Sequence, residues 1–83
     1  FRKSGMDRLR SMAVFVAVSE AGSLSAAARK FGEPLTNISR LLAQLEQHLG
    51  FTLIDRTTRR MALTDAGRDY LVSCRKVLDE IAN

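Results

Sequence analysis

Apolar residues recur every three or four positions in two neighbouring segments near the start of the chain, which is the spacing of one face of an α-helix. The first segment covers residues 7–22 and ends at a glycine. The second covers residues 24–31, begins after Ser23, whose hydroxyl can cap a helix, and ends at Gly32. We predict two helices joined by a short connection.

The clearest helical pattern follows over residues 35–49. Its apolar positions form one narrow stripe: Ile38, Leu41, Leu42, Leu45 and Leu49. Pro34 is tolerated in the first turn of this helix, and Gly50 ends it. Because a turn of only a few residues separates it from the preceding helix, the pair predicts a helix-turn-helix.

After the third helix the period changes from helical to alternating. Phe51 and Leu53 precede a polar, basic stretch, residues 55–60, and Met61 and Leu63 follow it at alternate positions. This pattern predicts a short two-stranded hairpin with a basic tip. A hairpin directly after a helix-turn-helix is a wing.

A last helical segment covers residues 64–83 and opens with Thr64 and Asp65. Its apolar stripe is too wide for a lone exposed helix. We expect its first half to pack on its own domain and its second half to meet a second copy of the chain. The residues assigned to this dimer contact are Tyr70, Cys74, Val77, Leu78 and Ile81.

The predicted fold class is therefore mainly α. It is a winged helix-turn-helix of three helices and a short two-stranded β wing, followed by a linker and dimerisation helix. We expect the winged domain over residues 6–63 and the last helix over residues 64–83, cut before its natural end. Residues 1–5, before Met6, read as a remnant of cloning.

Composition narrows the function classes. The 83 residues are 46% apolar, which suits one small folded domain. No apolar run is long enough for a membrane span and no signal peptide is visible, so we expect a cytoplasmic protein without a membrane partner. Cys74 and His48 are the only cysteine and histidine. They cannot form a disulfide or a structural zinc site, and we expect no cofactor, no metal and no enzyme.

Charge points to a polyanion as partner. The net charge is +4. Residues 1–33 have six basic and three acidic groups, and residues 34–63 have four and two. Residues 64–83 have three basic and four acidic groups. The basic part coincides with the predicted helix-turn-helix and wing, although a small protein can have such a balance without binding nucleic acid.

The helix over residues 35–49 has a polar face opposite its apolar stripe. Thr36, Arg40, Ala43 and Gln47 lie at its centre, flanked by other short polar residues. Arginine can pair with guanine, amides with adenine, and hydroxyls with several groups in the major groove. We predict that this helix reads duplex DNA. A solvated surface face is the simpler interpretation of the pattern when it is taken alone.

The neighbouring segments can contact the backbone. Ser23 and Ser25, near the start of the second helix, could donate to a phosphate, although Ser23 could equally serve only as a cap. In the wing, residues 56–60, an arginine could enter the minor groove, and we expect Arg56 instead to pair with a neighbouring acid. The predicted DNA-binding set is Ser23, Ser25, Leu35, Thr36, Asn37, Ser39, Arg40, Gln44, Thr57, Thr58, Arg59 and Arg60.

Several short stretches resemble the N-terminal domain of LysR-type transcriptional regulators. They are Phe15-Val16-Ala17-Val18, Gly22-Ser23-Leu24, Ala26-Ala27, Ser39-Arg40, Leu45-Glu46, Leu49-Gly50, Arg56-Thr57, Arg59-Arg60 and Leu63-Thr64-Asp65-Ala66-Gly67. Together, in this order, they cover essentially residues 6–83. The resemblance implies sequence-specific binding to promoter DNA as a homodimer through the last helix. It also implies tetramers of the full-length protein, and a small-molecule effector held by a C-terminal domain absent from this chain.

The sequence departs from the family pattern where the third helix begins. Residues 34–36 are Pro-Leu-Thr where members often have Ser-Gln-Pro. Leu35 therefore replaces the usual base-reading glutamine, and it could touch a thymine methyl or pack. Thr58 stands where a glycine is frequent in the wing. The alternative function is a winged-helix module that binds another protein without specific DNA readout.

Overall fold

The computed structural model describes residues 8–56 and 61–82. The elements, in chain order, are α1 (Arg8–Ala21), α2 (Leu24–Phe31), α3 (Leu35–Leu49), β1 (Ile54–Asp55), β2 (Ala62–Leu63) and α4 (Asp65–Ala82). Within the described residues the fold is mainly α, with a two-stranded wing between α3 and the long α4. The predicted fold class is confirmed.

The helix-turn-helix is built by local hydrogen bonds at the ends of its helices. Ser23 Oγ accepts a 3.0 Å bond from the amide of Ala26, which caps α2. Gly32 has φ 65°, a left-handed conformation that glycine adopts without steric cost. The amide of Glu33 donates to the carbonyl of Ala28 at 3.0 Å. This turn fixes the angle at which α3 leaves α2.

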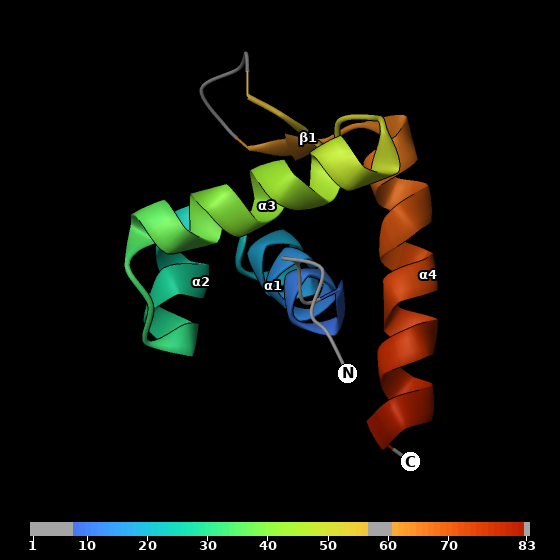
Figure 1. Cartoon of the computed structure of the whole chain (residues 1–83), viewed down its shortest axis with the longest axis horizontal. Helices are drawn as coiled ribbons and strands as arrows, with labels where there is room; N and C mark the ends of the chain where they lie inside the picture. The colour runs from blue at the N-terminus through green and yellow to red at the C-terminus, as the bar shows by residue number, and fades with distance from the viewer. Residues whose placement is uncertain (1–7, 57–60, 83) are drawn as a thin grey trace.

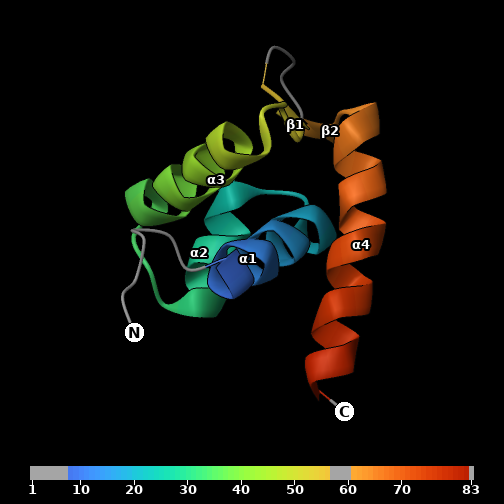
Figure 2. The same cartoon turned by 45° about the vertical axis from the view of Figure 1, so that its right-hand side comes forward.

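Helix α1 lies in the middle of the molecule, with α2 and α3 on one side and α4 on the other (Figures 1 and 2). The largest fully buried side chains come from all of these layers: Phe15, Ile38, Leu42, Leu45, Leu53, Val14, Val18 and Cys74. Burying a large apolar side chain of this kind stabilises the fold by about 1.5–3 kcal/mol. The apolar stripe of α3 thus anchors this helix to α1.

The wing is a short two-stranded antiparallel hairpin, as the alternation predicted. Ile54 pairs with Leu63 and Asp55 with Ala62, in antiparallel register. Phe51, which the pattern placed in the hairpin, is 41% exposed. Its ring instead meets Tyr70 edge-on, with centroids 6.5 Å apart. The predicted short hairpin is confirmed, and the amides at the base of β1 bind a side chain of α3.

That side chain is Glu46. One carboxylate oxygen accepts bonds from the amides of Leu53 at 2.8 Å and Ile54 at 3.2 Å. The other lies 3.5 Å from the guanidinium of Arg56. Because one carboxylate satisfies two backbone donors and one cation, α3 and the base of the wing are held as a unit.

Helix α4 begins against the wing. Thr64 Oγ1 donates to the carbonyl of Thr52 at 2.7 Å and accepts from the amide of Gly67 at 2.9 Å, so Thr64 caps α4 as predicted. A Cβ added at Gly67 would lie 2.1 Å from the carbonyl oxygen of Leu53. Only glycine permits this approach of α4 to the strand.

The two halves of α4 have different surroundings. Cys74 is fully buried in the domain's own core, so its side chain has no surface to offer a second subunit, contrary to the role the sequence pattern gave it. Val72, Val77 and Ile81 are 54%, 39% and 60% exposed. Beyond the core, α4 extends past the rest of the molecule (Figure 1). None of the helices within residues 8–56 and 61–82 has the length and apolar character to cross a bilayer.

Candidate nucleic-acid interface

The face of α3 that points away from the core is polar and exposed. Ile38, Leu42 and Leu45 have no accessible surface, whereas Arg40 and Gln44 are exposed. Thr36, Ala43 and Gln47 are exposed as well, in agreement with the pattern in the sequence. Figure 2 shows α3 at the edge of the molecule, where a duplex could approach this face. The width of a major groove admits one α-helix.

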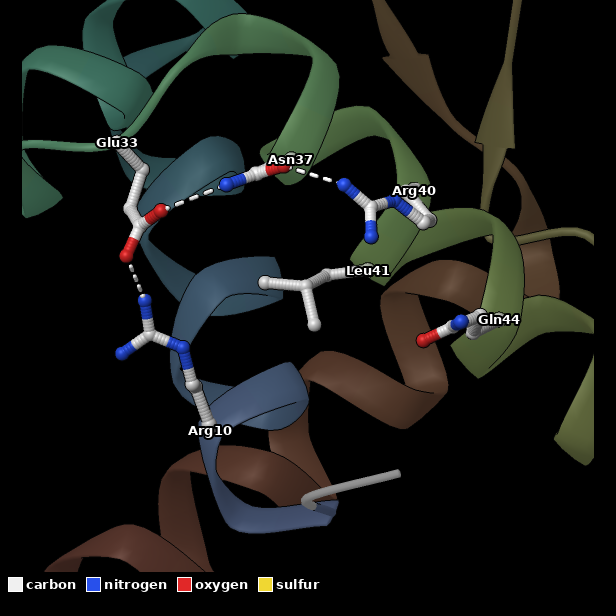
Figure 3. Close-up of a pocket in the computed structure, with 6 residues that line it drawn as sticks. All are labelled: Arg10, Glu33, Asn37, Arg40, Leu41 and Gln44. Atoms are coloured by element: carbon white, nitrogen blue, oxygen red, sulfur yellow. Dashed lines mark hydrogen bonds and ion pairs between the residues drawn. The ribbon is translucent and has the colours of Figure 1, made fainter. Parts of the chain in front are cut away.

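The first two turns of α3 contain a chain of hydrogen bonds that reaches back to α1 (Figure 3). Arg10 donates to Glu33 Oε2 at 2.5 Å. Asn37 Nδ2 donates to Glu33 Oε1 at 3.0 Å, and Asn37 Oδ1 accepts from the guanidinium of Arg40. The side-chain amide of Asn37 thus lies between the carboxylate of Glu33 and the guanidinium of Arg40.

A hollow on the surface adjoins this chain of bonds. It is lined by Arg10, Glu33, Asn37, Arg40, Leu41 and Gln44 (Figure 3). Arg10 also lies over the ring of Phe31, with its guanidinium carbon 5.9 Å from the ring centroid. Two arginines and the Glu33 carboxylate therefore line the hollow, and Glu33 is hydrogen-bonded to Arg10.

The remaining predicted contacts on the helices are placed as follows. Leu35 is 47% exposed, so about half of this residue is accessible at the start of α3. Ser39 is half-buried and Ser25 is exposed. The hydroxyl oxygen of Ser23 accepts the capping bond of α2, so the hydroxyl proton can still be donated to another acceptor.

In the wing, Arg56 pairs with Glu46, an acid on α3, as the sequence analysis expected of this residue. The four other predicted wing contacts lie outside the described residues: Thr57, Thr58, Arg59 and Arg60. Their assignment to DNA stays a prediction.

Sequence reasoning missed two carboxylates that organise the site. Glu33 was taken only as a turn residue, yet it binds Arg10 and Asn37. Glu33 precedes the cap residue Pro34 and lies outside α3, so the i,i+4 rule for helix faces does not predict its bond with Asn37. Arg10 is 23 positions from Glu33 and could not be linked to it from the sequence. The contact of Glu46 with the wing likewise depends on tertiary packing.

The buried thiol of α4 has no feature of a reactive cysteine. Burial raises the pKa of Cys74, which keeps the thiol protonated. In the part of the chain that the structure describes, no three His, Cys, Asp or Glu residues are grouped so that they could hold a metal ion. The described surface offers hydrogen-bonding and charged groups.

An exposed polar helix face, the turn before it and the adjacent wing define the class: a winged helix-turn-helix DNA-binding domain. Residues 9–68 match the family model described as bacterial regulatory helix-turn-helix protein, lysR family. The chain therefore belongs to the LysR family of transcriptional regulators, and it is a DNA-binding domain of that family, not an enzyme.

Characterised relatives and solved structures agree with this assignment. The chain is 43% identical over 76 residues, 92% of its length, to the HTH-type transcriptional activator AaeR of Escherichia coli K12. It is similar to the BenM DNA-binding domain in complex with catB site 1 DNA, with TM-score 0.88, 32% identity and coverage of 92% and 82% of the two chains. The CbnR DNA-binding domain bound to DNA gives TM-score 0.86, 34% identity and coverage of 92% and 87%.

The chain spans about a quarter of the length of its curated relatives: 25% of AaeR and 24% of a transcriptional repressor from Pseudomonas aeruginosa, to which it is also 43% identical. The similarity therefore concerns one domain of longer proteins.

Proposed function

We propose that this chain binds double-stranded DNA sequence-specifically, with α3 in the major groove and residues 56–60 of the wing at the backbone or adjacent minor groove. The observation that carries the proposal is the exposed polar face of α3, opposite Ile38, Leu42 and Leu45 in the core. Its arginine, amide and hydroxyl groups are those that discriminate base edges in the major groove.

The residues assigned to contacts divide by role. Arg40, Gln44, Asn37 and Ser39 are proposed to face bases, and Leu35 and Thr36 lie where the helix enters the groove. Ser23 and Ser25 are proposed to meet phosphates at the start of α2, together with the wing. Phosphate contacts supply most of the affinity, and base contacts supply the preference.

The chain is further proposed to act as a homodimer on promoter DNA, inside a longer cytoplasmic regulator. Val77 and Ile81, exposed and apolar on α4, support a contact with a second copy, and half-buried Leu78 lies beside them. A two-fold axis would place two recognition helices on successive major grooves, about 34–36 Å apart.

Tetramer formation and effector binding would belong to the full-length protein, in the part its relatives have beyond this domain. Relatives equally similar to this chain include an activator and a repressor.

Selection of bound sequences from a pool of random duplexes tests the proposal. The purified chain should enrich a half-site motif, and paired motifs should be spaced by about one helical turn. A titration against salt then separates DNA binding from the alternative, a protein-interaction module. The logarithm of the association constant should fall steeply with the logarithm of salt, with a slope of about −0.9 per phosphate contacted. No enriched motif and no binding at low salt would exclude the proposed function.

A further inference from the structure

The hydrogen-bond chain from Arg10 to Arg40 has a fixed chemical direction. A guanidinium can only donate and an ionised carboxylate can only accept. Glu33 therefore requires that Asn37 turn its NH2 group toward it, which leaves Asn37 Oδ1 as an acceptor for Arg40 (Figure 3). Because an amide has both a donor and an acceptor end, asparagine can connect Glu33 to Arg40, whereas a carboxylate or an apolar side chain at position 37 could not.

Each group is held from a different element. Arg10 comes from α1, Glu33 from the turn after α2, and Asn37 and Arg40 from α3. Glu33 is partly buried, with 28% of its side chain exposed, whereas Arg40 lies on the exposed face. Glu33 is thus more buried than Arg40, and the exposed end of the chain is where DNA is proposed to bind.

The negative charge of Glu33 must also be compatible with DNA nearby. A carboxylate beside a DNA-binding face repels phosphates, and the contact with Arg10 at 2.5 Å offsets this repulsion. The Arg10–Glu33 pair therefore allows an acid to remain at the edge of the interface, where its acceptor oxygen can hold Asn37.

We propose that Glu33 is a positioning residue for base recognition: through Asn37 it fixes the orientation of Arg40, and so it sets base preference without contacting DNA itself. This inference rests on the proposed function. It assigns Asn37 to the support of Arg40 more than to pairing with a base of its own.

Three variants separate positioning from charge. Glu33→Ala removes the acceptor and the charge, Glu33→Gln keeps an acceptor oxygen for Asn37 but removes the charge, and Glu20→Ala is the matched control. Glu20→Ala also removes one carboxylate, in this case from an ion pair with Arg75 that joins α1 to α4. The measurement is the dissociation constant for a duplex changed at the base pair whose preference Arg40→Ala abolishes, divided by the dissociation constant for the selected duplex.

For Glu33→Ala we expect this ratio to fall about three- to tenfold, a part of the discrimination that one well-placed arginine provides. Glu33→Gln should keep the ratio within about twofold, while affinity for all duplexes rises because Arg10 loses its counter-ion. Glu20→Ala should leave the ratio unchanged. In the double variant, Glu33→Ala should cause no further loss of preference once Arg40 is replaced by Ala, because both changes remove the same interaction.

A readout without DNA checks the contact itself. In the 15N–1H NMR spectrum of the free chain, the side-chain NH2 resonances of Asn37 should shift in Glu33→Ala and stay in place in Glu20→Ala. The same spectrum shows whether Glu33→Ala is folded. The inference is overturned if the folded variant keeps the full base preference. It is also overturned if the loss of preference in Glu33→Ala adds to the loss in Arg40→Ala. If the wild-type chain shows no base preference at all, the proposed function fails, and the positioning role fails with it.

Discussion

Among single residues, Arg40 most directly links the structure to recognition. It is exposed on the outer face of α3 and held by Asn37. Arg40→Ala should weaken binding to the selected duplex by ~1–3 kcal/mol and relax the preference at one base pair, since a bidentate contact to guanine is lost. Arg75→Ala, which removes the same charge from α4, should lower affinity less and equally for all duplexes. Fluorescence anisotropy titrations measure both effects, and equal losses for the two variants would contradict the role of Arg40.

Gly67 lies where the backbone leaves no room for a side chain. A Cβ at this position would lie 2.1 Å from the carbonyl oxygen of Leu53, so the start of α4 or the strand must move. Gly67→Ala should therefore destabilise the fold by ~1–3 kcal/mol, the cost of overpacking, although alanine is the better helix former. Urea unfolding measures this change. Ser73→Ala, at an exposed site of the same helix, should stay within about 0.5 kcal/mol of wild type. If Gly67→Ala is as stable as wild type, the close approach of α4 to Leu53 is not required for stability.

For the elements, the junction between α3 and the wing depends on Glu46. Glu46→Ala leaves the amides of Leu53 and Ile54 without their carboxylate and Arg56 without its partner. We expect a loss of about 1–3 kcal/mol of stability, the cost of stranding buried donors. Glu46→Gln, which keeps an acceptor oxygen, should lose less. Hydrogen exchange should show faster exchange of these two amides in Glu46→Ala. Unchanged exchange would mean that other groups hold the wing.

The helices were predictable as elements and the wing only in part. The bounds of α2 and α3 follow from local signals: a serine cap, two terminal glycines and a narrow apolar stripe. The short paired strands followed from the alternation, whereas the bonds of Glu46 to the amides of Leu53 and Ile54 did not. A local pattern cannot reveal which side chain from another element will take a backbone donor.

For the whole molecule, the second half of α4 is the place to test dimer formation. Val77 and Ile81 are exposed apolar residues beyond the core. The double variant Val77→Ser and Ile81→Ser should lower affinity for a duplex with two half-sites by at least about tenfold, since linked binding of two subunits is lost. Binding to a single half-site should not change. Glu80→Ser, next to Ile81, is the control. Equal affinity of wild type and double variant for the paired site, with unchanged sedimentation, would exclude α4 as the dimer contact.

The order of helices, the turn and the polar face of α3 were determined by the sequence alone, because caps, glycines and apolar spacing act between neighbours in the chain. The tertiary structure decided what depends on distant partners. It buried Cys74 in the core, joined Glu46 to the wing and brought Arg10 to Glu33 across 23 positions. Side-chain hydrogen bonds of this kind depend on the packing angle of whole helices, which no local pattern encodes. The orientation of the α3 face that is proposed to read bases is therefore a property of the folded domain.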